Sequence, residues 1–175
     1  MLAFVSAARY SELDDIFSAA SLRNELPFVI VLDGITDPHN LGAIIRSAEC
    51  NGAHGVIIPQ RRAVGLTPAA VKAAAGAEEY VHIVRVTNIT RAIETLKERG
   101  LWIVGADIGG EVLYHADMTG SVALVIGAEG EGISPLVRKS CDRIVSIPLH
   151  GKIESLNASV AAGIMMYVIS ASRQI

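Results

Sequence analysis

The stretch Phe28-Val-Ile-Val-Leu32-Asp33-Gly34 decides the fold class of this chain. Five consecutive apolar residues are followed by a polar pair that favours a turn. A short, continuous apolar run of this kind is typical of a strand that is buried on both faces of a sheet. A sheet with two buried faces needs a layer of helices on each side, so strands and helices should alternate along the chain.

The sequence on either side of this stretch shows that alternation. Further strands are expected at 56–58, 101–104, 122–126 and 144–147, and helices at 41–51, 67–75, 89–99, 134–140 and 155–170. Residues 1–26 are interpreted as a linker-like N-terminal extension with one short helix, which precedes a domain of residues 27–175. The pattern predicts an α/β fold with a mainly parallel sheet and helices on both faces. In such folds ligands bind at the carboxyl ends of the strands.

Composition narrows the classes of function. The 175 residues suffice for a core that needs no disulfide, and the chain opens without a basic and apolar leader pattern. The most apolar helical candidate, at 156–169, is shorter than the roughly 20 residues that a membrane span needs. We therefore expect a cytoplasmic protein with no membrane contact. The formal charge of −3 argues against a nonspecific nucleic-acid binder, but Arg61, Arg62 and Lys72 could form a local basic face.

Metal chemistry is not expected. The five histidines are scattered, and no spacing in the sequence aims two imidazoles at one ion. Cys50 and Cys141 lie far apart, outside any CxxC motif, and are interpreted as small buried thiols.

Three loops that leave predicted strands carry the chemical information. The first ends in Asp37-Pro-His-Asn-Leu-Gly-Ala-Ile-Ile-Arg46. Asn40 could cap the following helix, and Arg46, six residues later, could face the same side near the helix start. A capped helix with a solvated arginine would explain the same residues without any function.

The second loop, Ile126-Gly-Ala-Glu-Gly-Glu-Gly-Ile133, directly follows a strand. Its glycines suit a turn that wraps a ligand with backbone amides. A nicotinamide-dependent oxidoreductase is disfavoured, because the order is G-x-x-G-x-G and the acid that would bind a ribose is missing from the next strand end. Glu129 and Glu131 would also repel a pyrophosphate.

The third loop covers residues 147–159. Ser155 is a natural helix cap, and Asn157 and Ser159 place polar groups in the first turns of an otherwise apolar helix. Capping alone could explain these groups. The small residues at 161–163 permit close packing of this helix, either within the chain or across a dimer.

In this order the three loops resemble the signature motifs of the SpoU (TrmH-like) family of RNA 2′-O-ribose methyltransferases. The matching segments are Asp37-Pro-His-Asn-Leu-Gly-Ala-Ile-Ile-Arg46, Ile126-Gly-Ala-Glu-Gly-Glu-Gly-Ile-Ser134, Ser146-Ile-Pro-Leu149 and Ser155-Leu-Asn-Ala-Ser159. The resemblance covers roughly residues 27–175. It is strongest to the enzymes that methylate a guanosine ribose of 23S rRNA.

The resemblance implies a deep trefoil knot of the SPOUT type in the C-terminal segment, an exception to the rule that chains do not thread loops. It also implies that S-adenosyl-L-methionine binds in the knot and that the protein is a homodimer formed through the knot region. Carried over residue by residue, it assigns cofactor binding to Gly105, which is expected just after its strand, and to Gly127, Ile147 and Leu156.

For catalysis, the resemblance assigns the central role to Arg46. Asn40 and Glu129 would position the reacting groups, and Ser155 and Asn157 would complete the pocket. Arginine has a pKa above about 12 and is a poor general base. Binding a phosphate or stabilising the forming alkoxide is the physically easier role for its guanidinium.

Two alternatives stay open within this family. The RNA could be a transfer RNA, or the protein could be a catalytically silent RNA-binding paralogue, although the presence of all five site residues argues against silence. Relatives of this kind usually carry an N-terminal RNA-recognition domain. Since only 26 residues precede the matching region, we expect a shortened or minimal member with weaker RNA affinity.

Overall fold

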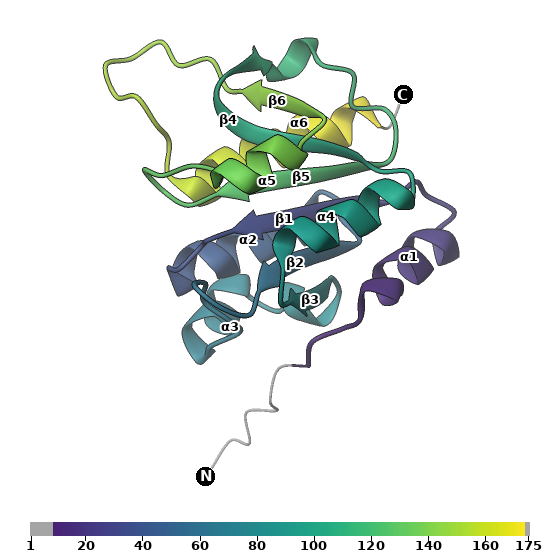
Figure 1. Cartoon of the computed structure of the whole chain (residues 1–175). Helices are drawn as coiled ribbons and strands as arrows, with labels where there is room; N and C mark the ends of the chain where they lie inside the picture. Colours follow the sequence, from purple (N-terminus) through teal and green to yellow (C-terminus); the bar gives the residue numbers. More distant parts are fainter. Residues whose placement is uncertain (1–8, 174–175) are drawn as a thin grey trace.

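The computed structural model describes residues 9–173 and contains a six-stranded sheet in which all neighbouring strands are parallel. The strand order is β3-β2-β1-β5-β4-β6 (Figure 1). The bounds are Phe28–Asp33 for β1, Gly55–Pro59 for β2, His82–Val86 for β3, Trp102–Val112 for β4, Val122–Gly127 for β5 and Arg143–Ser146 for β6. The sequence does not predict β3, because this edge strand mixes apolar residues with His82 and the exposed Arg85.

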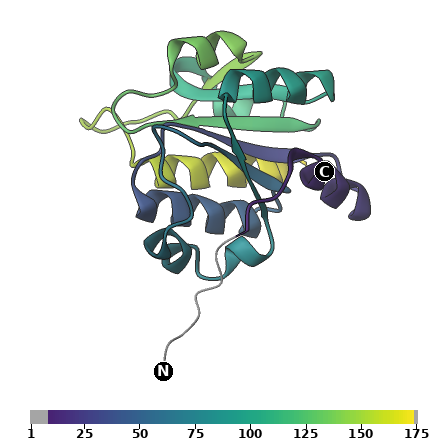
Figure 2. The same cartoon turned by 60° about the horizontal axis from the view of Figure 1, so that its bottom comes forward.

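Helices cover both faces of the sheet, as predicted. They are α1 (Leu13–Leu22), α2 (Pro38–Cys50), α3 (Pro68–Ala74), α4 (Ile89–Glu98), α5 (Pro135–Ser140) and α6 (Ala158–Ser172). Helices α2, α3 and α6 bury their apolar side chains in the core on one face, and α1, α4 and α5 bury theirs on the other (Figure 2). None of the helices within residues 9–173 is long and apolar enough to cross a bilayer.

The centre of the sheet sets the position of the functional loops. Residues 28–32 of β1 are buried, and β1 pairs with β5 in a register that runs from Phe28 opposite Val122 to Asp33 opposite Gly127. Both strands therefore end at the same level, and the loops that leave them begin side by side at the carboxyl edge.

Two helices begin at residues other than those predicted. Asp37 is the N-cap of α2, and its Oδ1 accepts a hydrogen bond from the His39 amide at 2.9 Å, so the prediction that Asn40 caps this helix is wrong. Pro38 has no amide hydrogen to satisfy, which suits it to the first helical position after an aspartate cap. The cap of α6 is Asn157, so the capping role predicted for Ser155 is also wrong.

The short helix expected within residues 1–26 is α1, and it packs against the sheet. Ile16 is fully buried, and a Cβ on Gly55 of β2 would lie closer than 3.0 Å to its side chain. Just before α1, the Ser11 amide donates to the carbonyl of Ile83 at 2.8 Å, which places this segment beside the edge strand β3.

The two cysteines differ in burial. Cys141 is half-buried, and burial raises the pKa of its thiol to about 11. Cys50 is exposed at the end of α2, so the prediction of a buried thiol is wrong there. One face of α2 packs against the core, and Cys50 lies in its last turn on the face that is exposed to solvent.

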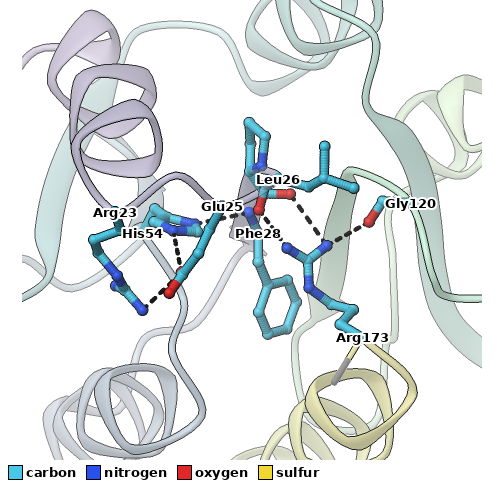
Figure 3. Close-up of polar contacts among 8 residues, drawn as sticks. Arg23, Glu25, Leu26, Phe28, His54, Gly120 and Arg173 are labelled. Atoms are coloured by element: carbon cyan, nitrogen blue, oxygen red, sulfur yellow. Dashed lines mark hydrogen bonds and ion pairs between the residues drawn. The ribbon is translucent and has the colours of Figure 1, made fainter. Parts of the chain in front are cut away.

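At the amino ends of the strands, a polar network holds β1 between α1 and α6 (Figure 3). The Nδ1 atom of the buried His54 accepts a hydrogen bond from the Phe28 amide at 3.0 Å, and its Nε2 lies 2.9 Å from Glu25. Arg173 at the end of α6 donates to the main-chain carbonyls of Leu26 and Gly120. Because Nδ1 must accept, the bonded form of His54 is the neutral tautomer with its proton on Nε2.

This arrangement makes the stability of the fold depend on pH. Burial, opposed only in part by the hydrogen bond to Glu25, lowers the pKa of His54 below its usual 6.5. Below about pH 6.5 the unfolded chain therefore binds a proton that the folded chain resists. We expect the free energy of unfolding to fall by up to about 1.4 kcal/mol for each pH unit between 6.5 and the lower pKa of the folded state.

Thermal melting of the wild type and of His54→Gln between pH 8 and pH 5 measures this dependence. The wild type should lose more stability on acidification than the variant, whatever their difference at pH 8. If the melting temperatures of the two proteins fell by the same amount between pH 8 and pH 5, His54 would not be the titrating group.

Candidate functional site

The Asn157 side chain joins the three loops at the carboxyl edge of the sheet. Its Nδ2 donates to Oδ1 of Asn40, at 3.1 Å, and to Oε1 of Glu129, at 2.6 Å. These residues are separated by 117 and 28 positions in the sequence, respectively. The structure therefore brings together three of the five side chains that the sequence assigns to catalysis.

The start of α6 fixes the orientation of this cluster. Oδ1 of Asn157 accepts from the amides of Ser159 and Val160, and Oε1 of Glu129 accepts from the Ala158 amide at 3.0 Å. A carboxylate at a helix N-terminus is also favoured by the helix dipole. With its oxygen engaged by the helix, the Asn157 amide must direct its Nδ2 toward Asn40 and Glu129.

The cluster leaves polar atoms available for a ligand. Asn40 is 7% exposed, and within residues 9–173 its Nδ2 donates to no acceptor. Glu129 uses Oε1 for two hydrogen bonds, while its Oε2 accepts none from the same part of the chain. One amide donor and one carboxylate acceptor thus lie in the same cluster, free to contact a bound molecule.

The glycine-rich loop is a compact turn. Ala128 and Gly132 exchange two backbone hydrogen bonds, and a Cβ on Gly127 would lie closer than 3.0 Å to the main chain of Gly132. Oδ2 of Asp33 accepts from the Ser134 amide at 2.8 Å and ties the loop to the end of β1. The sequence presents Asp33 only as a turn residue; its position at the end of a buried strand is the signal that could have marked it.

Gly105 lies within a strand. β4 continues to Val112, with an irregularity in its pairing to β6 between Ala106 and Glu111, so the prediction that Gly105 follows its strand is wrong. A Cβ at this position would lie within 3.0 Å of the side chains of Cys141 and Ile144. Close packing therefore already requires glycine at position 105. In the pairing of β4 with β5, Gly105 lies two positions before the level of Gly127.

The segment 147–157 forms the long loop between β6 and α6 (Figure 1). Within residues 9–173, no amide or carbonyl of residues 147–156 forms a backbone hydrogen bond. Ile147 packs against the core, Leu156 is 36% exposed, and Ser155 is exposed. This loop can offer both main-chain hydrogen-bonding groups and apolar surface to a ligand.

Arg46 does not join the cluster. It is exposed on α2 and forms no hydrogen bond or ion pair with any other residue of the described range 9–173. Six residues along a helix correspond to a rotation of about 240° and a rise of about 9 Å. The prediction that Asn40 and Arg46 face the same side is therefore wrong, because Asn40 points into the protein and Arg46 into solvent.

The cavities found away from this cluster lie at the opposite edge of the sheet. A cavity of about 340 Å³ lies at the amino ends of the strands, lined by residues such as Arg23, Asn51 and Arg173, and parallel sheets bind ligands at the opposite edge. Within residues 9–173 no group of three or more His, Cys, Asp or Glu side chains could hold a metal ion.

Comparison with known proteins identifies the family. The model of the SpoU rRNA Methylase family matches residues 27–167, which include all three loops. The chain belongs to this family. The SpoU-family chain is 49% identical over 160 residues to the 23S rRNA (guanosine-2′-O-)-methyltransferase RlmB of Escherichia coli (strain K12), covering 91% of this chain and 65% of that protein. It is also 49% identical to the TrmH-family protein YacO of Bacillus subtilis (strain 168), covering 99% of this chain and 70% of YacO.

Solved structures agree with this assignment. The SpoU methyltransferase AviRb from Streptomyces viridochromogenes, in complex with AdoMet, superimposes with a TM-score of 0.83 at 32% identity, over 95% of this chain and 66% of AviRb. An AdoMet-bound rRNA methyltransferase from Sinorhizobium meliloti gives 0.80 at 28% identity, over 93% and 61% of the two chains. The predicted α/β fold is confirmed, and so is the resemblance to the SpoU family. The chain spans between 44% and 70% of the length of the first curated relatives.

Proposed function

We propose that this SpoU-family chain transfers a methyl group from S-adenosyl-L-methionine to a ribose 2′-hydroxyl of RNA, with a guanosine of 23S rRNA as the target. The observation that carries the proposal is the Asn157 side chain, which joins the first and second motifs at the start of α6. RlmB, the relative from E. coli, is named for this reaction. Residues 27–175 would form the catalytic domain, and an RNA substrate suits a cytoplasmic location.

The residues at the carboxyl edge fit the cofactor. The main-chain groups of 147–156 are free to hydrogen-bond, and Ile147 and Leu156 supply apolar surface. Gly127 ends β5, and Gly105 lies on β4 two pairing positions before that level, so both are near the same edge of the sheet. These four residues would hold S-adenosyl-L-methionine, which supplies an electrophilic methyl group when bound.

The chain's own residues would then orient the ribose and ease loss of its proton. The free Nδ2 of Asn40 can donate to the 2′ oxygen, and the free Oε2 of Glu129 can accept a hydrogen bond from the substrate. Ser155, two residues before Asn157, would add a hydroxyl. The guanidinium of Arg46 can bind a phosphate or stabilise a forming alkoxide, since it has no carboxylate partner within residues 9–173.

We also propose that the C-terminal segment forms a trefoil knot. Helix α6 packs against α2 and β5 on one face, although β6 before it lies at the far edge of the sheet. Arg173 at its end donates to the carbonyl of Gly120, in the connection between β4 and β5. A crystal structure in which α6 runs outside that connection would overturn the knot.

A homodimer through this C-terminal region is supported by an apolar face of α6. Val160, Ile164 and Tyr167 recur at helical spacing and are 50%, 40% and 69% exposed. Burial of such a face against a second copy would remove it from water. Sedimentation should report twice the chain mass of 18.5 kDa for the wild type and a monomer for Tyr167→Glu.

Calorimetric titration of S-adenosyl-L-methionine into the wild type and Leu156→Arg tests the proposal. We expect the wild type to bind and the variant to bind about tenfold more weakly or worse, because a charge would occupy the apolar surface of the cofactor loop. Leu22→Arg, on the 88% exposed Leu22 of α1, is the matched control and should bind like the wild type. Binding of NADH in place of S-adenosyl-L-methionine, or of neither, would overturn the proposed function.

Transfer RNA is the second candidate substrate. The TrmH/SpoU tRNA modifying enzyme of A. aeolicus superimposes with a TM-score of 0.76 at 25% identity, and this chain covers 85% of that one. Methyl transfer from labelled S-adenosyl-L-methionine to 23S rRNA and to bulk tRNA, assayed side by side, separates the two candidates. Cofactor binding without transfer to either RNA would favour the silent paralogue.

A further inference from the structure

The loop between β2 and α3 carries positive charge that forms no ion pair with the residues that the structure describes. Residues 60–66 form this segment, called here the basic loop, at the carboxyl edge of the sheet. Between residues 60 and 77 the chain has three cations, Arg61, Arg62 and Lys72, and no carboxylate, although its formal charge is −3. All three side chains are exposed and form no ion pair with any residue of 9–173.

The basic loop is attached to the elements that hold the candidate active site. The Val64 amide donates to the carbonyl of Ile35, between β1 and α2, at 2.9 Å. Directly after the loop, Thr67 caps α3, and a Cβ on Gly42 of α2 would lie closer than 3.0 Å to Ala70 of α3. The loop is therefore fixed to the same helix that carries Asn40.

Tyr10 supports the loop from the other side. Its hydroxyl accepts a hydrogen bond from the Leu66 amide at 2.9 Å, and it lies so close to Gly65 that a Cβ there would be 2.8 Å away. The Arg85 guanidinium stacks over the Tyr10 ring at 4.9 Å and donates to the carbonyl of Gln60 at 3.4 Å. Both ends of the basic loop are thus held by side chains from outside it.

The backbone of the loop is strained at one of its charged residues. Arg62 has φ of +57°, a left-handed conformation that residues other than glycine, asparagine and aspartate rarely adopt. Glycine would adopt this conformation without strain. The backbone conformation therefore does not account for an arginine at position 62. Strained residues of this kind persist where surrounding contacts enforce them, and they cluster at binding sites.

We propose that the basic loop binds phosphates of the RNA substrate beside the active site, and that Tyr10 is a positioning residue that sets the conformation of the loop. The inference rests on the proposed function and adds the surface that receives the RNA backbone. Guanidinium groups suit this role because they pair with phosphate oxygens through two parallel hydrogen bonds. Binding of this kind is electrostatic, insensitive to base sequence and weakened by salt.

Binding of a labelled 23S rRNA transcript at several salt concentrations tests the proposal, with the full chain as wild type, Arg61→Ala, Arg62→Gly and Tyr10→Phe. Arg91→Ala is the control, because Arg91 is an exposed arginine on α4, on the opposite face of the sheet, and forms no ion pair within residues 9–173. We expect each loop arginine variant to reduce the slope of log K against log[salt] by about one, while the control keeps the wild-type slope.

Two further readouts separate binding from folding. Arg62→Gly should melt no lower than the wild type, because it removes the left-handed strain while it removes the charge. Tyr10→Phe keeps the ring under Arg85 but loses the acceptor for Leu66, so RNA should bind more weakly while both arginines are intact. All variants should bind S-adenosyl-L-methionine like the wild type.

The possible results distinguish the two proposals. If the wild type methylates RNA and the loop variants keep the affinity and salt slope of Arg91→Ala, the basic loop is not the RNA-binding surface. If only the arginine variants weaken binding and Tyr10→Phe does not, the positioning role of Tyr10 is wrong. If the wild type binds the cofactor but no RNA, both the loop and the proposed RNA substrate are overturned for this chain.

Discussion

Replacement of Gly127 with alanine should lower the free energy of unfolding by about 3 kcal/mol or more, at the upper end of the cost of overpacking a core. The new Cβ would collide with the main chain of Gly132, which cannot move without breaking its two hydrogen bonds to Ala128. For a chain of this size we expect the melting temperature to fall by about 10 °C. Cofactor binding should be lost as well, because the same turn lines the proposed site.

Gly151→Ala is the matched control for this experiment. Gly151 also lies in a loop at the carboxyl edge, but a Cβ there would meet nothing within 4 Å. Its variant should melt within about 1 °C of the wild type, since surface substitutions usually change stability by less than 0.5 kcal/mol. Equal melting temperatures for the two variants would show that the turn adapts to a side chain and does not require glycine.

The second large effect is expected for Arg46→Ala. If the guanidinium stabilises developing negative charge or holds the substrate phosphate, the rate of methyl transfer should fall by about 10²-fold or more. Arg46 is exposed, so the melting temperature should stay unchanged, and S-adenosyl-L-methionine should bind as in the wild type. Single-turnover transfer to 23S rRNA, with calorimetry of cofactor binding, measures both quantities.

Arg46→Lys distinguishes the role of the charge from that of a general base. A lysine keeps the positive charge and should restore part of the rate at every pH. If the arginine acted as a base, the lysine variant would instead show a rate that rises steeply with pH. Wild-type rates in Arg46→Ala would remove this residue from the catalytic site altogether.

The sequence predicts the layers of this fold better than its local starts and ends. The apolar runs at 28–32 and 122–126 identify the central strands, because strands buried on both faces leave a continuous signal. The edge strand β3 leaves none, since its exposed side is polar. The prediction of helix starts fails for a different reason. Asp37 and Asn40 are both good N-cap residues, and only the tertiary structure decides between them.

The candidate site, too, is predicted from the sequence only in part. The resemblance of the motifs to the SpoU family selects Asn40, Glu129 and Asn157, but only the structure shows that the Asn157 side chain joins the other two. The position of Asp33 at the end of a buried strand could mark it as a site residue, but its hydrogen-bond partner, 101 residues away, is known only from the structure. Arg46 shows the reverse case, because its helical position separates it from residues that neighbour it in the motif.

The pairing of β1 with β5 has a consequence for synthesis of the protein. β1 is the first strand of this sheet to be synthesised, yet one of its two partners in the sheet begins about 90 residues later. At about 5–20 residues per second, one edge of this apolar strand waits roughly 5–20 s for its neighbour. During that interval the nascent chain exposes an unpaired, aggregation-prone strand edge. The yield of native protein in a cell should therefore depend on chaperones and on the speed of translation through residues 34–121.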